Sequence, residues 1–216
     1  MTDFIVHGIP GSPFLRAVIA TLEEKGAPYQ LKPLPPGGHR TEAYLAMHPF
    51  GRVPVIQHGD FTLYETQAVL RYIDATCDGA ALQPKDPQTA ARMNQLLGIN
   101  DWYFFPKIGV PIVFQRIVGP ILMGLTPDEA IIAAALPDAA NCTGVIKGFL
   151  SDRAFLVGDA LTLADLHLYP HLAMLAQTPE GRSLMNGTRL EAWLQRMAAR
   201  PSMIASQPPE ALRWLV

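Results

Sequence analysis

Cysteine is scarce in this sequence of 216 residues: only Cys77 and Cys142 occur, and no CxxC pair is present. Two isolated thiols exclude the disulfide framework of a small secreted domain and a cysteine-rich zinc site. Both cysteines lie in apolar surroundings, so we predict two reduced, buried thiols; a disulfide between them is the alternative. Neither lies beside a phosphate-binding loop, a histidine or a second thiol, which argues against a cysteine nucleophile.

Charged residues are also few, at 17% of the chain, whereas apolar residues make up 49%. This composition indicates a folded globular protein, with enough residues to bury the core of one large domain or two modest ones. The net charge is −2, and the lysines and arginines are scattered. Because a nucleic-acid-binding surface needs a basic patch or stripe, we expect no nucleic-acid partner.

Uninterrupted apolar runs are short. The most apolar segment, residues 108–125, contains Gln115, Arg116 and two prolines, and it falls short of the roughly 20 apolar residues of a membrane span. The first residues, MTDFIVHG, carry an aspartate and no basic region before an apolar stretch, so no secretory signal is predicted. We therefore expect a soluble, cytoplasmic protein without a membrane partner.

The six histidines show no metal-ligand spacing. His167 and His171 stand four residues apart, but the sequence shows no carboxylate or water-activating partner beside them. We therefore predict no metal site.

The first third of the chain alternates between strand and helix patterns. Apolar runs predict strands over residues 4–7, 29–34, 53–57 and 61–64. Apolar spacing at i, i+3 and i+4 predicts helices over residues 13–25, over 41–47 and from Glu65 onward. This βαβ–α–ββ–α order can be satisfied by a mixed sheet of four strands.

Beyond this region the sequence shows only helical patterns. Residues 78–87 are rich in turn formers and predict a linker between an α/β domain over residues 1–77 and an all-α domain over residues 88–216. Thr162 and Asp165 form a capping box, flanked by Leu161 and Leu166 as its hydrophobic staple. We expect the helical half to be broken or kinked at five positions, namely Pro106, Gly109, Pro111, Pro170 and Pro179.

Two short motifs allow both a structural and a chemical interpretation. Ser12–Pro13 is a common way to begin a helix, but the same serine could donate a hydrogen bond to a thiolate at the helix end. Lowering a thiol pKa of ~8.5 by about two units needs roughly 2.7 kcal/mol. Glu65–Thr66 could cap a helix, with a benefit of about 0.3–1 kcal/mol, or could hold a carboxylate on Thr66 and an ammonium on Glu65. The residues of this second motif, taken alone, favour the cap.

Val53–Pro54 lies at the start of a predicted strand. Proline is tolerated there because it removes a single ladder donor. Since only about 5–6% of X–Pro bonds are cis, the residues alone favour an ordinary trans peptide.

The segment from Gly38 to Ile73 carries a further pattern. It contains a basic pair at His39–Arg40, the heptapeptide HPFGRVP over residues 48–54, Gly59–Asp60, and ETQAV over residues 65–69. With this spacing it resembles the glutathione-binding half of cytosolic glutathione transferases, most closely the phi class and its bacterial relatives. The family pattern there is a basic pair, then NPFG-x-[VI]P, a hairpin with G-D, and E-S-x-A-I.

This resemblance implies a thioredoxin-like N-terminal domain and an all-α C-terminal domain. It implies a homodimer in which the N-terminal domain of one subunit meets the C-terminal domain of the other. The implied activity is attack of the glutathione thiolate on a small hydrophobic electrophile, with glutathione as co-substrate and no metal. A glutathione-dependent peroxidase or reductase, and a non-catalytic glutathione-binding scaffold, remain as alternatives.

The resemblance also assigns roles to residues. Ser12 takes the position of the thiol-activating serine, where omega- and beta-class enzymes have cysteine, which argues against glutathione–disulfide exchange. Glu65 and Thr66 would hold the γ-glutamyl ammonium and carboxylate, and the backbone of Val53, before a cis Pro54, would pair with the cysteinyl part. The glycyl carboxylate would meet His39 and Arg40. The remaining glutathione-binding candidates are Phe14 and Arg52, where arginine replaces the usual Gln or Lys.

The helical half holds the implied electrophile pocket. The candidate lining residues are Trp102, Phe105 and Phe114, although aromatic side chains in such a stretch commonly form core. Asp101 either supports the γ-glutamyl site or is a solvated helix acid.

Overall fold

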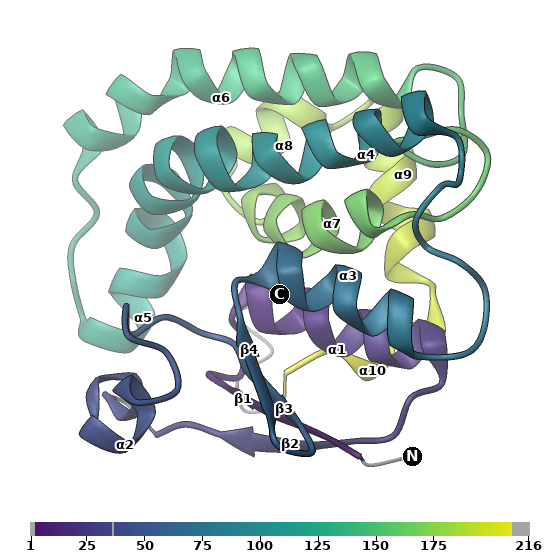
Figure 1. Ribbon diagram of the computed structural model, residues 1–216. Coiled ribbons are helices and arrows are strands. Elements are labelled where there is room, and N and C mark those ends of the chain that lie inside the picture. Colours follow the sequence, from purple (N-terminus) through teal and green to yellow (C-terminus); the bar gives the residue numbers. More distant parts are fainter. Residues whose placement is uncertain (1–2, 36, 209–216) are drawn as a thin grey trace. The chain divides into compact units, whose positions relative to one another are not determined.

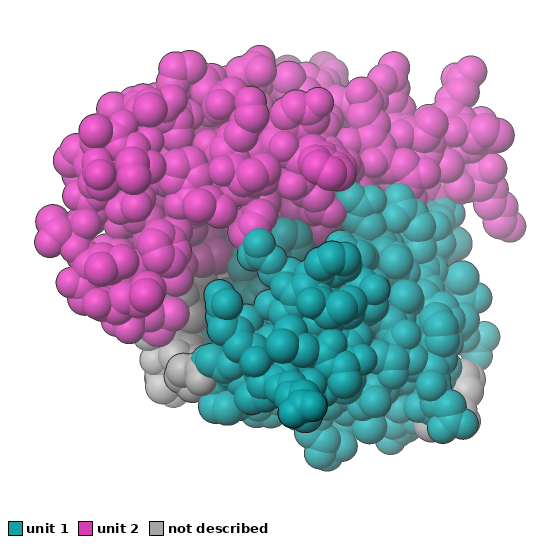
Figure 2. Space-filling model, turned by 60° about the vertical axis from the view of Figure 1, so that its left-hand side comes forward, with its two compact units in different colours: residues 1–83, 200–214 teal, residues 84–199, 215–216 magenta. Residues whose placement is uncertain are grey.

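The computed structural model describes residues 3–35 and 37–208, and the chain divides into two compact units. Within the described residues, the first unit holds residues 3–35, 37–83 and 200–208, and the second holds residues 84–199. Figure 2 colours the first unit teal and the second magenta.

The first unit is a four-stranded mixed sheet with helices (Figure 1). Its elements are β1 (Phe4–Gly8), α1 (Pro13–Lys25), β2 (Tyr29–Pro33), η1 (Gly38–Arg40), α2 (Glu42–Leu45), β3 (Val55–His58), β4 (Phe61–Tyr64), α3 (Thr66–Thr76) and α10 (Pro201–Ala205). The strand order is β2-β1-β3-β4, with β1 and β2 parallel and the other pairs antiparallel. The predicted mixed sheet and thioredoxin-like fold class are therefore confirmed.

Helix α1 forms as its sequence predicts. Ser12 is the N-cap and Pro13 occupies the first turn, where its missing N–H costs nothing. Gly26 ends the helix in the left-handed conformation, with φ of 60°. The apolar face of α1 is fully buried, at Leu15, Val18, Ile19 and Leu22.

Residues 200–208 return to the first unit and pack on α1. Arg200 donates two hydrogen bonds of 2.9 Å to the carboxylate of Glu24, and the Ser202 hydroxyl donates to the same carboxylate. Arg16, which is 3% exposed, donates through Nη2 to the carbonyl oxygen of Met203 at 3.2 Å. These charge-assisted contacts fix α10 against α1.

The second unit is helical, and residues 84–199 contain no β-strand. Its elements are α4 (Pro87–Ile99), η2 (Asn100–Val118), α5 (Gly119–Met123), α6 (Glu129–Leu150), α7 (Leu163–Ala176), α8 (Pro179–Met185) and α9 (Arg189–Ala198). Helix α7 is buried on nearly all sides, because α4, η2, α8 and α9 pack around it. The predicted all-α half is confirmed.

The predicted capping box starts α7. Asp165 is fully buried and accepts hydrogen bonds from the Thr162 N–H and hydroxyl, both at 3.1 Å. Its other oxygen accepts the Leu156 N–H at 2.9 Å and the Trp193 indole N–H at 3.1 Å. One carboxylate therefore joins the start of α7 to the preceding loop and to α9.

The helix is not broken at Pro106 or Pro111, but it bends, so the expected kink is present. Both prolines lie inside η2, and one helix runs over Pro87–Met123 and changes direction between α4 and α5 (Figure 1). This stretch has a π-helical pattern, in which the Gly119 N–H bonds to the Phe114 carbonyl oxygen five residues earlier. A wider turn relieves the clash of the proline ring with the preceding turn, so the helix can continue. Pro170 likewise lies within α7, whereas Pro179 begins α8.

Two helices, Pro87–Met123 and Glu129–Leu150, are long and apolar enough to cross a membrane by length and composition alone. Core helices of soluble proteins pass the same test. Of the 18 most apolar consecutive residues in each helix, only 28% in the first and 33% in the second are buried within the chain. Much of their apolar surface is therefore exposed in the single chain.

Cys77 and Cys142 are both free thiols. Burial, together with the charge of Asp138, raises the pKa of the Cys142 thiol to about 11. Cys77 is only half-buried, so the prediction of two buried thiols is correct for Cys142 alone.

Candidate functional site

The register of the sheet gathers four loops at one edge. Gly8 of β1 lies opposite Pro33 of β2, and His7 lies opposite Val55 of β3, which in turn faces Tyr64 of β4. Each loop that leaves or enters the sheet at this edge carries predicted site residues. We call the set the sheet-edge site, and it comprises Ser12, Phe14, His39, Arg40, Arg52, Val53, Pro54, Glu65 and Thr66.

Ser12 lies at the N-terminus of α1, directly after β1. Its Oγ accepts the Leu15 N–H over 3.4 Å, a long and therefore weak capping bond. The hydroxyl proton is donated to no described residue. The half-buried serine can cap the helix and still donate a hydrogen bond to an anion at the helix end. Phe14, also half-buried, lies in the first turn beside it.

Glu65 adopts an unusual backbone conformation between β4 and α3, with φ of 68° and ψ of 109°. A positive φ at a residue other than glycine is strained and occurs preferentially at functional sites. The Glu65 side chain makes no capping hydrogen bond; its carboxylate is exposed and, in the described part of the chain, has no ion-pair partner. Glu65 therefore occupies the N-cap position of α3 without making a capping hydrogen bond, which leaves its carboxylate available to a ligand.

Thr66 is the first residue of α3 and is 7% exposed. Its hydroxyl makes no hydrogen bond within residues 3–35 and 37–208. Because Glu65 provides no side-chain cap to α3, the Thr66 N–H at the start of the helix is available to an anion. The hydroxyl and the backbone N–H of Thr66 thus lie next to an exposed carboxylate, a combination that suits an amino acid zwitterion.

The peptide bond between Val53 and Pro54 is cis, as the resemblance implies and against the expectation from the residues alone. Val53 precedes the ladder of β3, which begins at Val55. Neither the N–H nor the carbonyl of Val53 makes a backbone hydrogen bond to another described residue. A donor and an acceptor on the same residue are therefore available to the main chain of a ligand.

Three basic side chains belong to this edge. His39 and Arg40 lie in η1, and a Cβ on Gly51 would be 3.1 Å from the carbonyl oxygen of His39, so the loop that carries Arg52 touches η1. Arg40 and Arg52 are exposed, and neither forms an ion pair with a described residue. These cations can therefore bind a carboxylate of a ligand.

Sequence analysis did not identify the aromatic group behind this edge. The Tyr44 hydroxyl donates to the carbonyl oxygen of Arg52 over 2.8 Å, and burial raises the pKa of Tyr44 to about 12. His48, 2% exposed, stacks on Tyr64 with ring centroids 4.5 Å apart. The aromatic run of Tyr44, His48, Phe50 and Tyr64 was the available signal, but only the fold brings these residues together.

The three predicted pocket aromatics lie on η2 in the second unit. Trp102 is 76% exposed, whereas Phe105 and Phe114 are half-buried. Phe105 packs edge-on against His171, with ring centroids 5.9 Å apart.

Asp101 is not a solvated helix acid. Its Oδ1 lies 2.7 Å from Nε2 of the fully buried His167 and accepts a hydrogen bond from Asn100 Nδ2 at 3.0 Å. The statement that His167 lacks a carboxylate partner is therefore wrong, because the fold brings Asp101 to it from 66 residues away. Burial, and then the neighbouring His167, hold the pKa of His171 well below its ordinary value. Among the described residues, no group of three or more His, Cys, Asp or Glu could hold a metal ion.

The chain matches two family descriptions. Residues 6–81 match the glutathione S-transferase N-terminal domain, and residues 100–201 match the glutathione S-transferase C-terminal domain.

Curated relatives agree with these matches. The chain is 33% identical over 208 residues to glutathione S-transferase 3 of Zea mays, covering 94% of this chain and 92% of the relative. It is 32% identical over 201 residues to a glutathione S-transferase of Hyoscyamus muticus, covering 91% and 94%.

Solved structures are similar over nearly the whole chain. Glutathione transferase F7 from Populus trichocarpa aligns with a TM-score of 0.84 at 30% identity, covering 94% of this chain and 97% of that one. Maize glutathione S-transferase I, solved in complex with an atrazine glutathione conjugate, aligns with a TM-score of 0.83 at 26% identity, covering 95% and 96%.

Proposed function

The chain belongs to the glutathione S-transferase family, and we propose that the sheet-edge site binds glutathione with Ser12 as the residue that activates its thiol. In the transferase reaction the glutathione thiol loses its proton to solvent. The thiolate then attacks an electrophilic carbon, a C–S bond forms, and the bond to the leaving group breaks as that group departs with its electron pair. The observation that carries this proposal is the register of the sheet, which brings Ser12 to the same edge as Val53 and Glu65.

Ser12 suits this role because its hydroxyl proton is not used within the described chain. A hydrogen bond from the hydroxyl to the thiolate contributes about 1.5–3 kcal/mol. The N-terminus of α1 contributes roughly 0.3–1 kcal/mol more. Together they are sufficient to lower the thiol pKa by about two units.

The rest of the sheet-edge site matches the polar groups of glutathione in order. The Glu65 carboxylate receives the γ-glutamyl ammonium, and the hydroxyl and backbone N–H of Thr66 at the start of α3 receive the adjacent carboxylate. The free backbone groups of Val53 pair with the cysteinyl residue. His39, Arg40 and Arg52 supply positive charge for the glycyl carboxylate, and Phe14 contributes apolar surface next to Ser12.

The electrophile is small and hydrophobic in this proposal, with Trp102, Phe105 and Phe114 as lining residues. The support for Trp102 is its exposure of 76%, since an aromatic side chain of that size is seldom left in water without a partner.

We also infer a cytoplasmic homodimer. Exposed apolar side chains occur on both units, among them Phe50 at 71% in the first and the apolar surfaces of η2 and α6 in the second. Apolar surface of this kind commonly marks an interface. Light scattering should give about twice the chain mass of 23.6 kDa, and a monomer would refute this inference.

Ser12→Ala tests the catalytic assignment. We expect glutathione binding to persist while turnover of an activated aryl halide falls at least tenfold, or about 1.4 kcal/mol of transition-state stabilisation. Ser12→Thr, which keeps a hydroxyl, is the matched control. Unchanged turnover in Ser12→Ala would refute the role of Ser12.

The alternatives give different results with the unmodified protein. Failure to bind a glutathione-affinity column would refute the whole proposal. Retention without turnover would indicate a binding scaffold. Reduction of an organic hydroperoxide without aryl halide conjugation would indicate the peroxidase.

A further inference from the structure

His48 lies buried behind the sheet-edge site, in the segment that joins α2 to β3. The side chain is 2% exposed. Its backbone N–H bonds to the Tyr44 carbonyl oxygen at 2.9 Å, and its own carbonyl oxygen accepts the Gly51 N–H at 2.9 Å. The pattern NPFG-x-[VI]P of the glutathione transferases has asparagine where this chain has His48.

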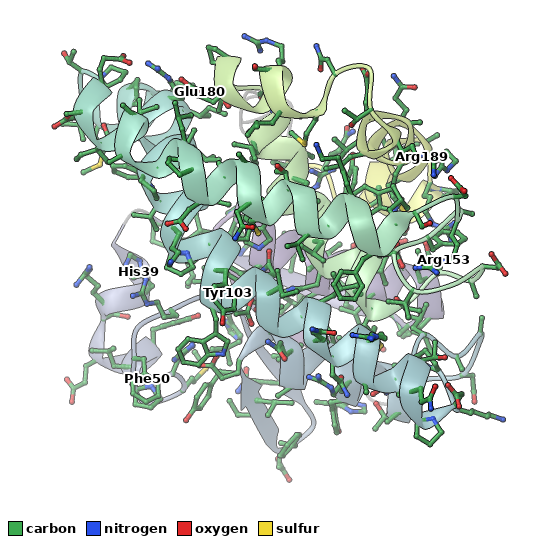
Figure 3. All side chains as sticks on the ribbon, turned by 90° about the horizontal axis from the view of Figure 1, so that it is seen from above. His39, Phe50, Tyr103, Arg153, Glu180 and Arg189 are labelled. Carbon is green, nitrogen blue, oxygen red and sulfur yellow. The ribbon has the colours of Figure 1, made fainter. Side chains whose placement is uncertain are left out.

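Three aromatic side chains surround the imidazole ring. Tyr64 stacks on it at 4.5 Å with an interplanar angle of 26°, and Tyr44 lies parallel to it at 6.5 Å. Phe50, labelled in Figure 3, lies edge-on at 6.2 Å and forms the exposed side of this group.

These contacts connect the ring to two binding segments of the sheet-edge site. Tyr64 is the residue directly before Glu65, whose positive φ must be held by its surroundings. Tyr44 donates through its hydroxyl to the carbonyl oxygen of Arg52, the residue directly before Val53. His48 contacts both tyrosines, so its ring connects the segment that carries Glu65 to the segment that carries Val53.

The ring also interacts electrostatically with the site. Burial lowers the pKa of His48, the Glu65 carboxylate opposes this effect, and the Arg52 guanidinium adds to it. Tyr44, which packs against the ring, is uncharged at neutral pH because burial raises the pKa of its hydroxyl to about 12. Tyr64 is the other tyrosine that packs against the ring. The Nδ1 atom of His48 is buried and has no hydrogen-bond partner in residues 3–35 and 37–208. The ring is therefore neutral at pH 7.

Protonation of His48 would place a cation next to Glu65, the residue that receives the ligand ammonium. The two cations would then compete for one carboxylate, and the charged ring would lose solvation in its aromatic surroundings. Protonation of His48 and binding of the ligand ammonium by Glu65 therefore weaken each other.

We propose that His48 is a positioning residue for glutathione, that its ring holds the Tyr64–Glu65 turn against the Arg52–Val53 segment, and that only its neutral form supports tight binding. This inference rests on the proposed function of the sheet-edge site.

The test measures the dissociation constant of S-methylglutathione by calorimetry at pH 7.5 and pH 5.0. This probe has no thiol, and none of its remaining groups titrates appreciably between these two values. We expect the dissociation constant of the unmodified protein to rise about fivefold or more at pH 5.0, as expected for a binding site that must lose a proton.

His48→Phe keeps the ring and its stacking but cannot be protonated. We expect its dissociation constant at pH 7.5 to lie within about twofold of the parent value and to change less than about twofold at pH 5.0. His39 is present in both proteins, so it contributes equally to both sets of measurements. His48→Asn, the family residue, should also lose the pH dependence.

His48→Ala removes the stacking and separates positioning from folding. We expect weaker glutathione binding at pH 7.5, by about fivefold, with kcat at saturating glutathione within about twofold of the parent. A purely structural role would instead lower the melting temperature and the active fraction without changing KM.

The proposal is overturned if His48→Phe keeps the pH dependence of the parent, or if folded His48→Ala binds as tightly as the parent. If His48→Ala does not fold, the comparison with His48→Phe decides alone. Failure of the unmodified protein to bind S-methylglutathione at pH 7.5 would refute the proposed function instead.

Discussion

The Lys25 ammonium donates a hydrogen bond to Asp74 Oδ1 over 3.0 Å, and both side chains are almost fully buried. Lys25 ends α1 and Asp74 lies near the end of α3. The same carboxylate accepts the Leu82 and Gln83 N–H groups at 2.9 and 3.1 Å. A single ion pair therefore fixes α1 and α3 to each other and to the chain that leaves α3.

Asp74→Ala should destabilise the protein strongly. It leaves the Lys25 ammonium buried without its anion, and breaking a buried pair in this way costs about 3–5 kcal/mol. Asp74→Asn, which keeps one acceptor oxygen for a backbone donor, should cost less. Urea unfolding followed by circular dichroism measures both variants. Equal stability of the alanine variant and the parent would contradict this account.

The ion pair also predicts how stability depends on pH. Burial alone would raise the pKa of Asp74, but hydrogen bonds from Leu82, Gln83 and Lys25 lower it below its ordinary value. The stability that the ionised Asp74 carboxylate contributes is then fully present above about pH 3.9. It is lost as the pH falls through the lowered pKa of Asp74. Unfolding titrations between pH 2 and 6 should show a steeper acid loss in the parent than in Asp74→Asn.

Asp165→Ala should be equally disruptive in the second unit. Four donors lose their acceptor, and each buried unsatisfied group costs about 1–3 kcal/mol before relaxation. Because this carboxylate joins α7 and α9, we expect a soluble yield well below that of the parent. Asp165→Asn keeps one acceptor and should retain more stability in a thermal melt. A melting temperature within a few degrees of the parent in Asp165→Ala would argue against this role.

Glu65 allows backbone strain to be separated from ligand binding. Glu65→Gly and Glu65→Ala both remove the carboxylate, and both should raise the dissociation constant for glutathione about tenfold. Only glycine adopts the positive φ freely, so Glu65→Gly should be more stable than Glu65→Ala by about 1 kcal/mol. Calorimetric binding and denaturant unfolding provide the two measurements. Glutathione binding at the parent level in either variant would contradict the ammonium-binding role.

Arg52 is tested with a modified ligand. Arg52→Ala should weaken glutathione binding about fivefold, because one charge-assisted contact to the glycyl carboxylate is lost. With glutathione monoethyl ester, whose glycyl carboxylate is blocked, the variant and the parent should bind alike. Arg40→Ala serves as the parallel variant, and Arg92→Ala, in the second unit, as the control. If Arg52→Ala loses affinity equally for glutathione and for its ester, Arg52 does not bind the glycyl carboxylate.

Local sequence patterns predicted the elements well where neighbouring residues decide the structure. The α1 cap at Ser12, the Gly26 terminus and the Thr162–Asp165 box each depend on residues within a few positions. At Pro106 and Pro111 the helix bends without ending, because the wider turn of a π-helical stretch relieves the clash of each proline ring with the preceding turn. Asp101 and His167 could not be paired from the sequence, since 66 residues separate them.

Local sequence patterns were enough to predict the two-part architecture and the mixed sheet, because apolar periodicity and turn formers are local properties. The candidate residues for glutathione came from the resemblance of the Gly38–Ile73 segment to the glutathione transferases. Tertiary structure decided which of these residues share an edge, since strand register depends on pairing between distant segments. It also decided the positive φ of Glu65, because a strained backbone conformation persists only when its surroundings hold it. The burial of His48 behind the site belongs to the same class, as it depends on aromatic side chains from α2 and β4 that only the folded sheet brings together.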